Sequence, residues 1–136
     1  MPRGTSSVAD ARVVDASVLV ELAILRTGWR SVAEQLGGVA MHAPAHVDVE
    51  VMSALARLAR AGTLSGDQAK AALDRFRSAP ITRHELPDLV PGAWARTDRL
   101  RVADALYVEL AASLRVRVLS TDARLARASG LVDLVG

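Results

Sequence analysis

Residues 12–25 read RVVDASVLVELAIL, and the pattern of this stretch indicates the fold class. The apolar pair Val13-Val14 runs directly into Asp15, and apolar side chains then recur at helical spacing from Ser17 to Leu25. We therefore predict a short buried strand, Arg12–Asp15, followed by a helix. A strand that leads into a helix is the repeating unit of α/β proteins.

The same alternation continues along the chain. Short apolar runs that predict further strands lie at Val39–Met41, Ile81–Leu86, Val116–Ser120 and Leu131–Val135. Helical patterns span Trp29–Leu36, Pro44–Arg60, a segment capped by Ser65 that ends near Ser78, a Pro-flanked stretch reaching Arg99, Ala103–Leu114, and Asp122–Ser129. This order predicts an α/β fold, a three-layer α/β/α sandwich around a short, mainly parallel sheet of four to five strands.

Length and composition fit one small domain. The chain has 136 residues, so we expect a flexible tail at 1–11 and a single domain at 12–136. The absence of cysteine excludes disulfides and thiolate metal sites. No apolar run approaches the roughly 20 residues that span a bilayer, and the N-terminus lacks the apolar core of a secretory signal. We expect a cytoplasmic protein without a membrane partner.

The charge pattern is informative only in part. All but one of the 17 basic residues are arginine, yet the formal net charge is only +2. The arginine bias is explained equally well by genomic base composition and by a set of phosphate clamps. Aromatic residues make up 3% of the chain, which argues against RNA-binding surfaces built on base stacking.

Three acids occupy positions where an α/β protein places its active site. Ligands of open parallel sheets bind outside the carboxyl ends of the strands. Asp15 closes the first strand, Asp122 follows the fourth, and Asp104 lies in the first turn of a helix. By position alone Asp122 is more typical of a helix N-cap, and Asp104 is also typical of a first-turn acid that the helix dipole favours. Asp15 follows buried valines, where a carboxylate is costly unless a cation meets it.

A fourth acid lies on the helix predicted for Pro44–Arg60. The apolar stripe of that helix centres near Val47 and Leu58, and Asp48 and Glu50 flank it on opposite sides. Periodicity does not choose between these two acids.

The histidines point to no metal site. His42 and His46 are four residues apart, but Pro44 lies between them, and we expect the two rings on different faces. The chain has no HExxH pattern, so zinc is not supported. We expect His84 to be a surface residue without a partner.

Four segments in register resemble the PIN-domain ribonucleases, in particular the VapC-type toxins of bacterial toxin–antitoxin pairs. They are VVDASVLVELA (13–23), HAPAHVDVEVMSALARL (42–58), VADALYVELAASL (102–114) and VLSTDARLARASGL (118–131). The resemblance spans nearly the whole chain after the tail. It implies that Asp15, Glu50, Asp104 and Asp122 form the family's acidic quartet, with Ser17 and Ser120 in supporting roles.

An acidic quartet implies a divalent cation. Two carboxylates about 5 Å apart repel by roughly 3 kcal/mol at an effective dielectric constant near 20, so four in one pocket are tolerated mainly with a cation present. All-oxygen ligands select hard ions, hence Mg²⁺, for which Mn²⁺ can substitute. The resemblance implies metal-activated hydrolysis of RNA that leaves 5′-phosphate and 3′-hydroxyl ends.

Four arginines are candidates for contacts with the RNA backbone, or else charges on solvated helix faces. Arg96, Arg99 and Arg101 precede Asp104, and Arg124 follows Asp122. The resemblance also implies a homodimer held by a cognate antitoxin. Candidate docking surfaces are the apolar faces of the helices in 17–36 and 44–79, although the core of a monomer would use the same residues.

Other functions fit less well. A receiver domain needs a lysine at a strand end, and Lys70 lies mid-helix. Haloacid-dehalogenase-like phosphatases need a second Asp where this chain has Ser17. The remaining alternative is a catalytically idle PIN-like domain that binds RNA or a protein.

Overall fold

A five-stranded parallel sheet forms the centre of the structure, a computed structural model that describes residues 10–136. The strands are β1 (Ala11–Val14), β2 (Ala40–Pro44), β3 (Ile81–His84), β4 (Val118–Ser120) and β5 (Val132–Leu134). Their order across the sheet is β3-β2-β1-β4-β5, and every neighbouring pair is parallel. This confirms the predicted α/β fold and fixes the number of strands in the described residues at five.

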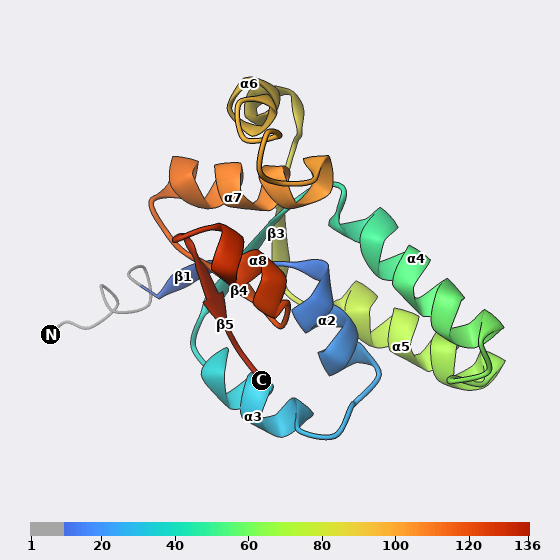
Figure 1. Ribbon diagram of the computed structural model, residues 1–136. Helices are drawn as coiled ribbons and strands as arrows, with labels where there is room; N and C mark the ends of the chain where they lie inside the picture. The colour runs from blue at the N-terminus through green and yellow to red at the C-terminus, as the bar shows by residue number, and fades with distance from the viewer. Residues whose placement is uncertain (1–9) are drawn as a thin grey trace, which may run out of the picture.

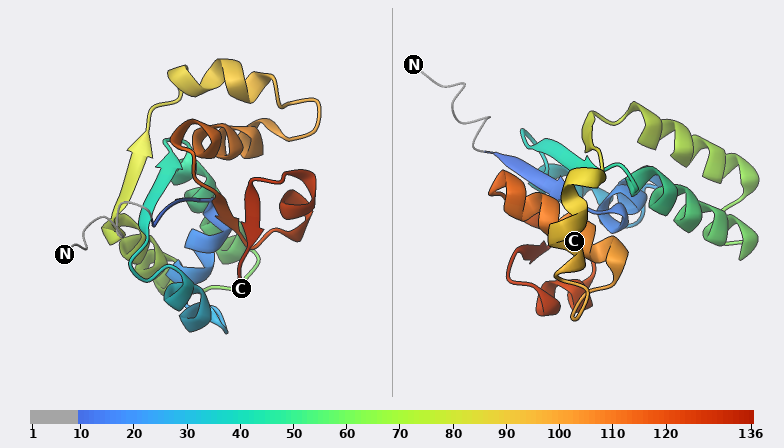
Figure 2. Two further views of the ribbon diagram at one scale, coloured as in Figure 1. Left: turned by 90° about the vertical axis from the view of Figure 1, so that its left-hand side faces the viewer. Right: turned by 90° about the horizontal axis from the view of Figure 1, so that it is seen from above.

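Seven α-helices and one short 3-10 turn connect the strands in residues 10–136. They are α2 (Ala16–Ala23), α3 (Trp29–Gln35), α4 (Val47–Arg60), α5 (Gly66–Ser78), the turn Pro87–Leu89, α6 (Val90–Trp94), α7 (Val102–Leu114) and α8 (Ala123–Ala128). Figures 1 and 2 show α7 on one face of the sheet and α2 and α3 on the other, which gives three layers. The α4–α5 pair protrudes to one side. None of these helices is long and apolar enough to cross a bilayer.

The core lies between the sheet and its two helical layers. Val13 and Val14 of β1 are completely buried, as the apolar run before Asp15 predicts. Helix α7 buries apolar side chains on most of its circumference, because the sheet covers one side and α6 packs on another.

The strand order places a crevice beside β1. The connections from β1 lead to β2 and β3 on one side, and β4 lies on the other, so the order reverses at β1. Val14 and Leu119 are register partners there. Asp15 follows β1 directly, and Asp122 lies two residues after the end of β4. Ligands of such sheets bind at this switch point.

Two local predictions were wrong. Pro44 ends β2 instead of starting the next helix, which begins at Val47; the Ala45 N–H then donates to His84 O at 2.8 Å and extends the pairing with β3. His84 has a partner after all, because its Nε2 lies 2.8 Å from His42 Nδ1 across the two strands. Of the predicted tail 1–11, residues 1–9 lie outside the described part, and β1 already begins at Ala11.

Candidate active site

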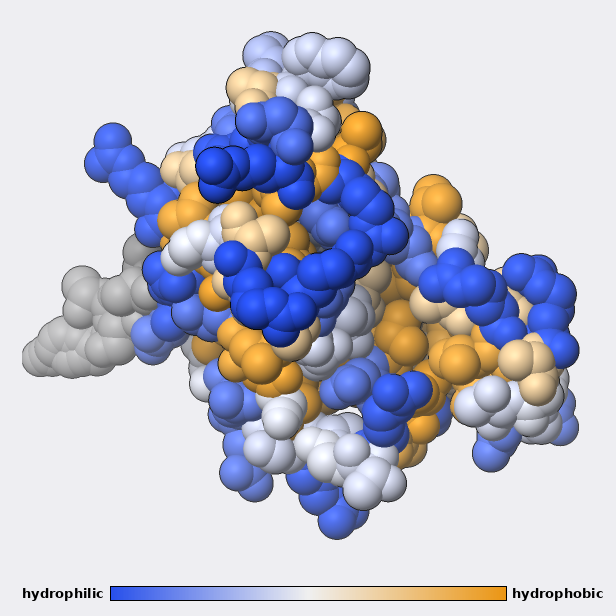
Figure 3. All heavy atoms as spheres, in the orientation of Figure 1, coloured by the Kyte–Doolittle hydropathy of each residue, from blue (hydrophilic) through white to orange (hydrophobic). Residues whose placement is uncertain are grey.

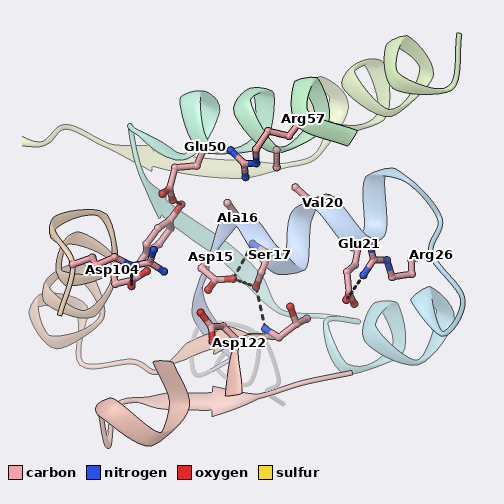
Figure 4. Close-up of a pocket in the computed structure, with 14 residues that line it drawn as sticks. Asp15, Ala16, Ser17, Val20, Glu21, Arg26, Glu50, Arg57, Asp104 and Asp122 are labelled. Carbon is pink, nitrogen blue, oxygen red and sulfur yellow. Dashed lines mark hydrogen bonds and ion pairs between the residues drawn. The ribbon is translucent and has the colours of Figure 1, made fainter. Parts of the chain in front are cut away.

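One pocket of about 370 Å³ at the carboxyl ends of β1 and β4 brings the four predicted acids together. Asp15, Glu50, Asp104 and Asp122 all line it, although they come from four different parts of the chain (Figure 4). Its other polar lining residues are Ser17, Glu21, Arg26, Arg57, Arg101, Tyr107 and Thr121.

Asp15 is buried at the centre of this pocket, with only 6% of its surface exposed. It is the N-cap of α2, and its carboxylate accepts hydrogen bonds from the backbone N–H groups of Ser17 and Val18. The Ser17 hydroxyl donates to the same oxygen at 2.5 Å. Within residues 10–136 no basic side chain forms an ion pair with Asp15, so its charge is met by dipoles alone.

The pKa of the Asp15 carboxyl is shifted by this burial. Burial raises the pKa of the Asp15 carboxyl to about 6, although hydrogen bonds from Ser120, Ser17 and Val18 lower it. The nearby charge of Asp104 raises it further. The Asp15 carboxylate is therefore electrostatically unsatisfied at neutral pH, as expected of a group that awaits a cation.

Asp122 lines the same pocket and caps α8. Its carboxylate accepts from the backbone N–H groups of Arg124 and Leu125, and the Arg124 guanidinium lies 3.3 Å away. Burial opposes ionisation of Asp122, but these contacts outweigh it and lower the pKa of this carboxyl. Asp122 is thus both a helix cap and a pocket residue, so the two interpretations of its position are compatible.

A hydroxyl network joins the ends of β1 and β4. Ser17 Oγ accepts from the Thr121 N–H at 3.0 Å and lies 3.4 Å from Ser120 Oγ. Ser120, which is fully buried, accepts from the Asp122 N–H at 3.0 Å. The two serines therefore hold the loops that carry Asp15 and Asp122 at a fixed separation.

The structure resolves the choice between Asp48 and Glu50. Asp48 faces β3, where Arg83 binds its carboxylate with bonds of 2.7–3.0 Å. Glu50 faces the pocket, and the Tyr107 hydroxyl donates to its Oε1 at 2.7 Å. His46 lies one turn before Glu50, with its ring packed on Tyr107 and its Nε2 3.7 Å from the same oxygen. These two rings hold the Glu50 carboxylate in place at the pocket wall.

The predicted arginines divide into two groups. Arg101 lines the pocket beside Asp104, at 3.6 Å from its carboxylate. Arg99 and Arg124 join Arg101 around a small adjoining cleft. Arg96 lines neither space, because its guanidinium binds Glu109 at 3.1 Å.

Five polar lining residues escaped the sequence analysis: Glu21, Arg26, Arg57, Tyr107 and Thr121. Arg57 lies seven residues, about two helical turns, after Glu50, and Tyr107 lies three after Asp104, so both follow from helical spacing once the first acid is known. Glu21 is four residues after Ser17 by the same rule. Arg26, in the turn after α2, carries no such signal; it forms a 3.9 Å ion pair with Glu21.

The donor set fits a hard divalent cation. All the acidic ligands available are carboxylates, with serine and tyrosine hydroxyls beside them. As the side chains stand, no three acidic or imidazole groups in residues 10–136 converge closely enough to hold an ion. Each acid is instead held by its own partner, and Asp15 alone is deeply buried without a basic one.

Comparisons with known proteins agree with this geometry. The family described as PIN domain matches residues 12–131. The chain is 50% identical to "Ribonuclease VapC3" of Mycobacterium tuberculosis over the full length of both proteins. Two solved structures share the fold. VapC20 of Mycobacterium tuberculosis, described as a "Sarcin-Ricin loop cleaving toxin", superposes with a TM-score of 0.66 and 18% identity over 91% of this chain and 98% of its own. VapBC2 of Rickettsia felis superposes with a TM-score of 0.67 and 12% identity over 93% of this chain and 99% of its own.

Proposed function

This chain belongs to the PIN-domain family, and from that premise we propose that it is a divalent-metal-dependent endoribonuclease, the toxin of a bacterial type II toxin–antitoxin pair. Full-length similarity to a named VapC ribonuclease supports the reaction class. Such a toxin would act in the cytoplasm, where cellular RNA is found.

The observation that carries the proposal is the state of Asp15. A buried carboxylate without a basic partner, in a pocket with three further acids, is destabilising unless a cation binds there. Asp15, Glu50, Asp104 and Asp122 would hold Mg²⁺, or Mn²⁺ in its place. When bound, such an ion lowers the pKa of a water ligand and stabilises the charge that develops on the phosphate.

The side chains of this protein have distinct tasks in that reaction. Asp15 and Asp122 are positioned by the Ser17–Ser120 hydroxyl network, and Glu50 by Tyr107 and His46. Arg101 beside Asp104, with Arg99 and Arg124 in the adjoining cleft, would bind backbone phosphates of RNA. No side chain need form a covalent bond to phosphorus, because water is the nucleophile.

An apolar cleft supplies a surface for a protein partner. Leu19, Leu22, Trp29, Met41 and Phe76 line a space of about 360 Å³ between α2, α3, α5 and β2. Its walls are almost entirely apolar, and its helices are among those expected to carry docking surfaces. We assign this cleft to the cognate antitoxin, and a homodimer forms part of the same proposal.

The test is cleavage of a structured RNA by the purified chain in Mg²⁺, in Mn²⁺ and in EDTA. We expect cleavage in both metals, none in EDTA, and products with 5′-phosphate and 3′-hydroxyl ends. RNA that is bound but left intact in every buffer would instead identify an idle RNA-binding domain.

A further inference from the structure

Two further hollows adjoin the active-site pocket, one at each end. The first, of about 90 Å³, shares Arg101 and Asp104 with the pocket. The second, of about 350 Å³, shares Glu21 and Thr121 with it and lies between α3, β5 and the β4–α8 turn. Figure 4 shows Asp104 and Glu21 at opposite ends of the pocket, with Asp15 between them. The three spaces therefore form one track across the carboxyl edge of the sheet.

The two ends of this track differ in charge. The small hollow is lined by Arg99, Arg101 and Arg124, and Figure 3 shows strongly hydrophilic side chains on the face that carries α8 and the loop before α7. No basic residue lines the larger hollow, and Glu21 is its only charged side chain among the described residues. A phosphate is therefore favoured at the arginine end, whereas the charge of Glu21 at the other end is met by Arg26 at 3.9 Å.

The two ends also differ in size and chemistry. The arginine end has about a quarter of the volume of the other, enough for a phosphoryl group but not for a base. The larger hollow falls in the range of about 300–1,000 Å³ typical of small-ligand pockets. Buried Val32 and Val135 supply an apolar floor, and Thr27 and Ser31 supply exposed hydroxyls at its rim. Apolar walls with a few hydroxyls suit a neutral heterocycle and a ribose.

We infer that this larger hollow, the Ser31 pocket, binds the base and ribose of the RNA nucleotide on one side of the scissile phosphate. The phosphate on the other side lies against Arg99, Arg101 and Arg124. This inference rests on the proposed function and deepens it, because it assigns the pocket that selects a base at one position. The link to catalysis is short: the Thr121 N–H donates to Ser17 Oγ, which donates to Asp15.

The first experiment fills the pocket. Ser31 is exposed on the helix α3, so Ser31→Trp places an indole in the hollow with little cost to the fold. Thr63→Trp, in the exposed turn between α4 and α5, is the matched control. Both variants and wild type cleave a randomised RNA pool in Mg²⁺, and sequencing of the product ends gives the base preference at each position. We expect Ser31→Trp to flatten the preference at one nucleotide beside the cut, and Thr63→Trp to leave it unchanged.

The second experiment measures binding without cleavage. Fluorescence anisotropy measures the affinity of Asp15→Asn for a labelled RNA that contains the mapped cleavage site. Two further RNAs each carry one abasic nucleotide, the first on one side of that site and the second on the other. We expect loss of one base, but not the other, to weaken binding about tenfold, and Ser31→Trp to abolish the difference.

The outcomes separate the two proposals. If wild type cleaves RNA but Ser31→Trp alters neither base preference nor binding, the pocket assignment is wrong and the ribonuclease proposal stands. If Ser31→Trp weakens only capture of the antitoxin, the pocket belongs to the protein partner and the assignment is likewise wrong. If wild type cleaves no RNA, the proposed function fails. The pocket assignment is then tested by binding of mixed-sequence RNA to Asp15→Asn and to the double variant with Ser31→Trp. Equal affinity of the two proteins would overturn the pocket assignment.

Discussion

The Tyr107 hydroxyl donates a hydrogen bond of 2.7 Å to Glu50 Oε1 and so joins α7 to α4 at the wall of the active-site pocket. Tyr107 is 1% exposed, and burial together with the neighbouring Glu50 raises the pKa of its hydroxyl, so it remains a donor at every physiological pH. Glu50 is thereby oriented by a rigid, buried group.

Removing this hydroxyl should weaken metal binding more than it weakens the fold. Tyr107→Phe keeps the ring but releases Glu50, and loss of a residue that orients a ligand typically costs about 10–100-fold in metal affinity. Calorimetric titration with Mn²⁺ measures the effect, with Ser113→Ala on the same helix as control. Unchanged Mn²⁺ affinity in Tyr107→Phe would show that Glu50 does not depend on this contact.

Replacing any of the four pocket acids should reduce RNA cleavage strongly, whereas replacing Asp48 should not. We expect Asp15→Asn, Glu50→Gln, Asp104→Asn and Asp122→Asn each to lower Mg²⁺-dependent cleavage by at least about a hundredfold, because each removes a charge that the reaction needs. Asp48→Asn is the matched control on the helix of Glu50; it loses a partly exposed ion pair worth at most about 1 kcal/mol and should stay active. An inactive Asp48→Asn beside an active Glu50→Gln would reverse the assignment of α4.

Asp15 should make the metal-free protein less stable as the pH rises. A carboxyl whose folded-state pKa is raised contributes its full stability below the unfolded pKa and loses it as the pH rises through the folded pKa. With a folded pKa of about 6, the loss occurs between about pH 4 and pH 6 and amounts to roughly 3 kcal/mol. Denaturant unfolding of wild type and Asp15→Asn in EDTA measures it as the difference between the two proteins, which should grow over this range in favour of Asn. A difference that does not vary with pH would contradict the raised pKa.

Metal should stabilise the wild type. A ligand that binds only the folded state adds about 2.7 kcal/mol at a hundredfold excess over its Kd, and each kcal/mol raises the Tm by about 2–8 °C in domains of this general size. Thermal melting with Mn²⁺ and with EDTA should show this rise, and Asp15→Asn or Asp104→Asn should shrink it. Equal increments in wild type and both variants would place the bound ion elsewhere.

Expression of the chain alone in a bacterial host should arrest growth, since cleavage of cellular RNA stops protein synthesis. Asp15→Asn should relieve the arrest, and so should the protein encoded by the adjacent upstream gene. Leu22→Arg, in the apolar cleft, should leave cleavage unchanged but prevent this rescue. Growth curves and co-purification measure the rescue. If the upstream protein rescues cells that express Leu22→Arg as completely as cells that express wild type, the cleft is not part of the partner interface.

The sequence alone determined the fold class and the position of Asp15. Strand and helix periods are local properties, and a buried Val-Val pair that ends in an acid is visible without any long-range information. The mainly parallel sheet followed from the same alternation, because parallel strands need a helical crossover to reach one another.

The family resemblance favours Glu50 over Asp48, but it took the packed structure to show that Glu50 is the acid of α4 that faces the pocket. Periodicity shows which side of a helix is buried, but Asp48 and Glu50 lie at the two edges of the same apolar stripe. Packing sets what each edge contacts. Asp48 contacts Arg83 of β3, and Glu50 contacts Tyr107 of α7. The contact between His42 and His84 has the same origin. So does the ion pair with Glu109 that keeps Arg96 out of the pocket. Contacts between residues far apart in the chain depend on strand order and register, and these arise from the summed packing of the whole core rather than from any single segment.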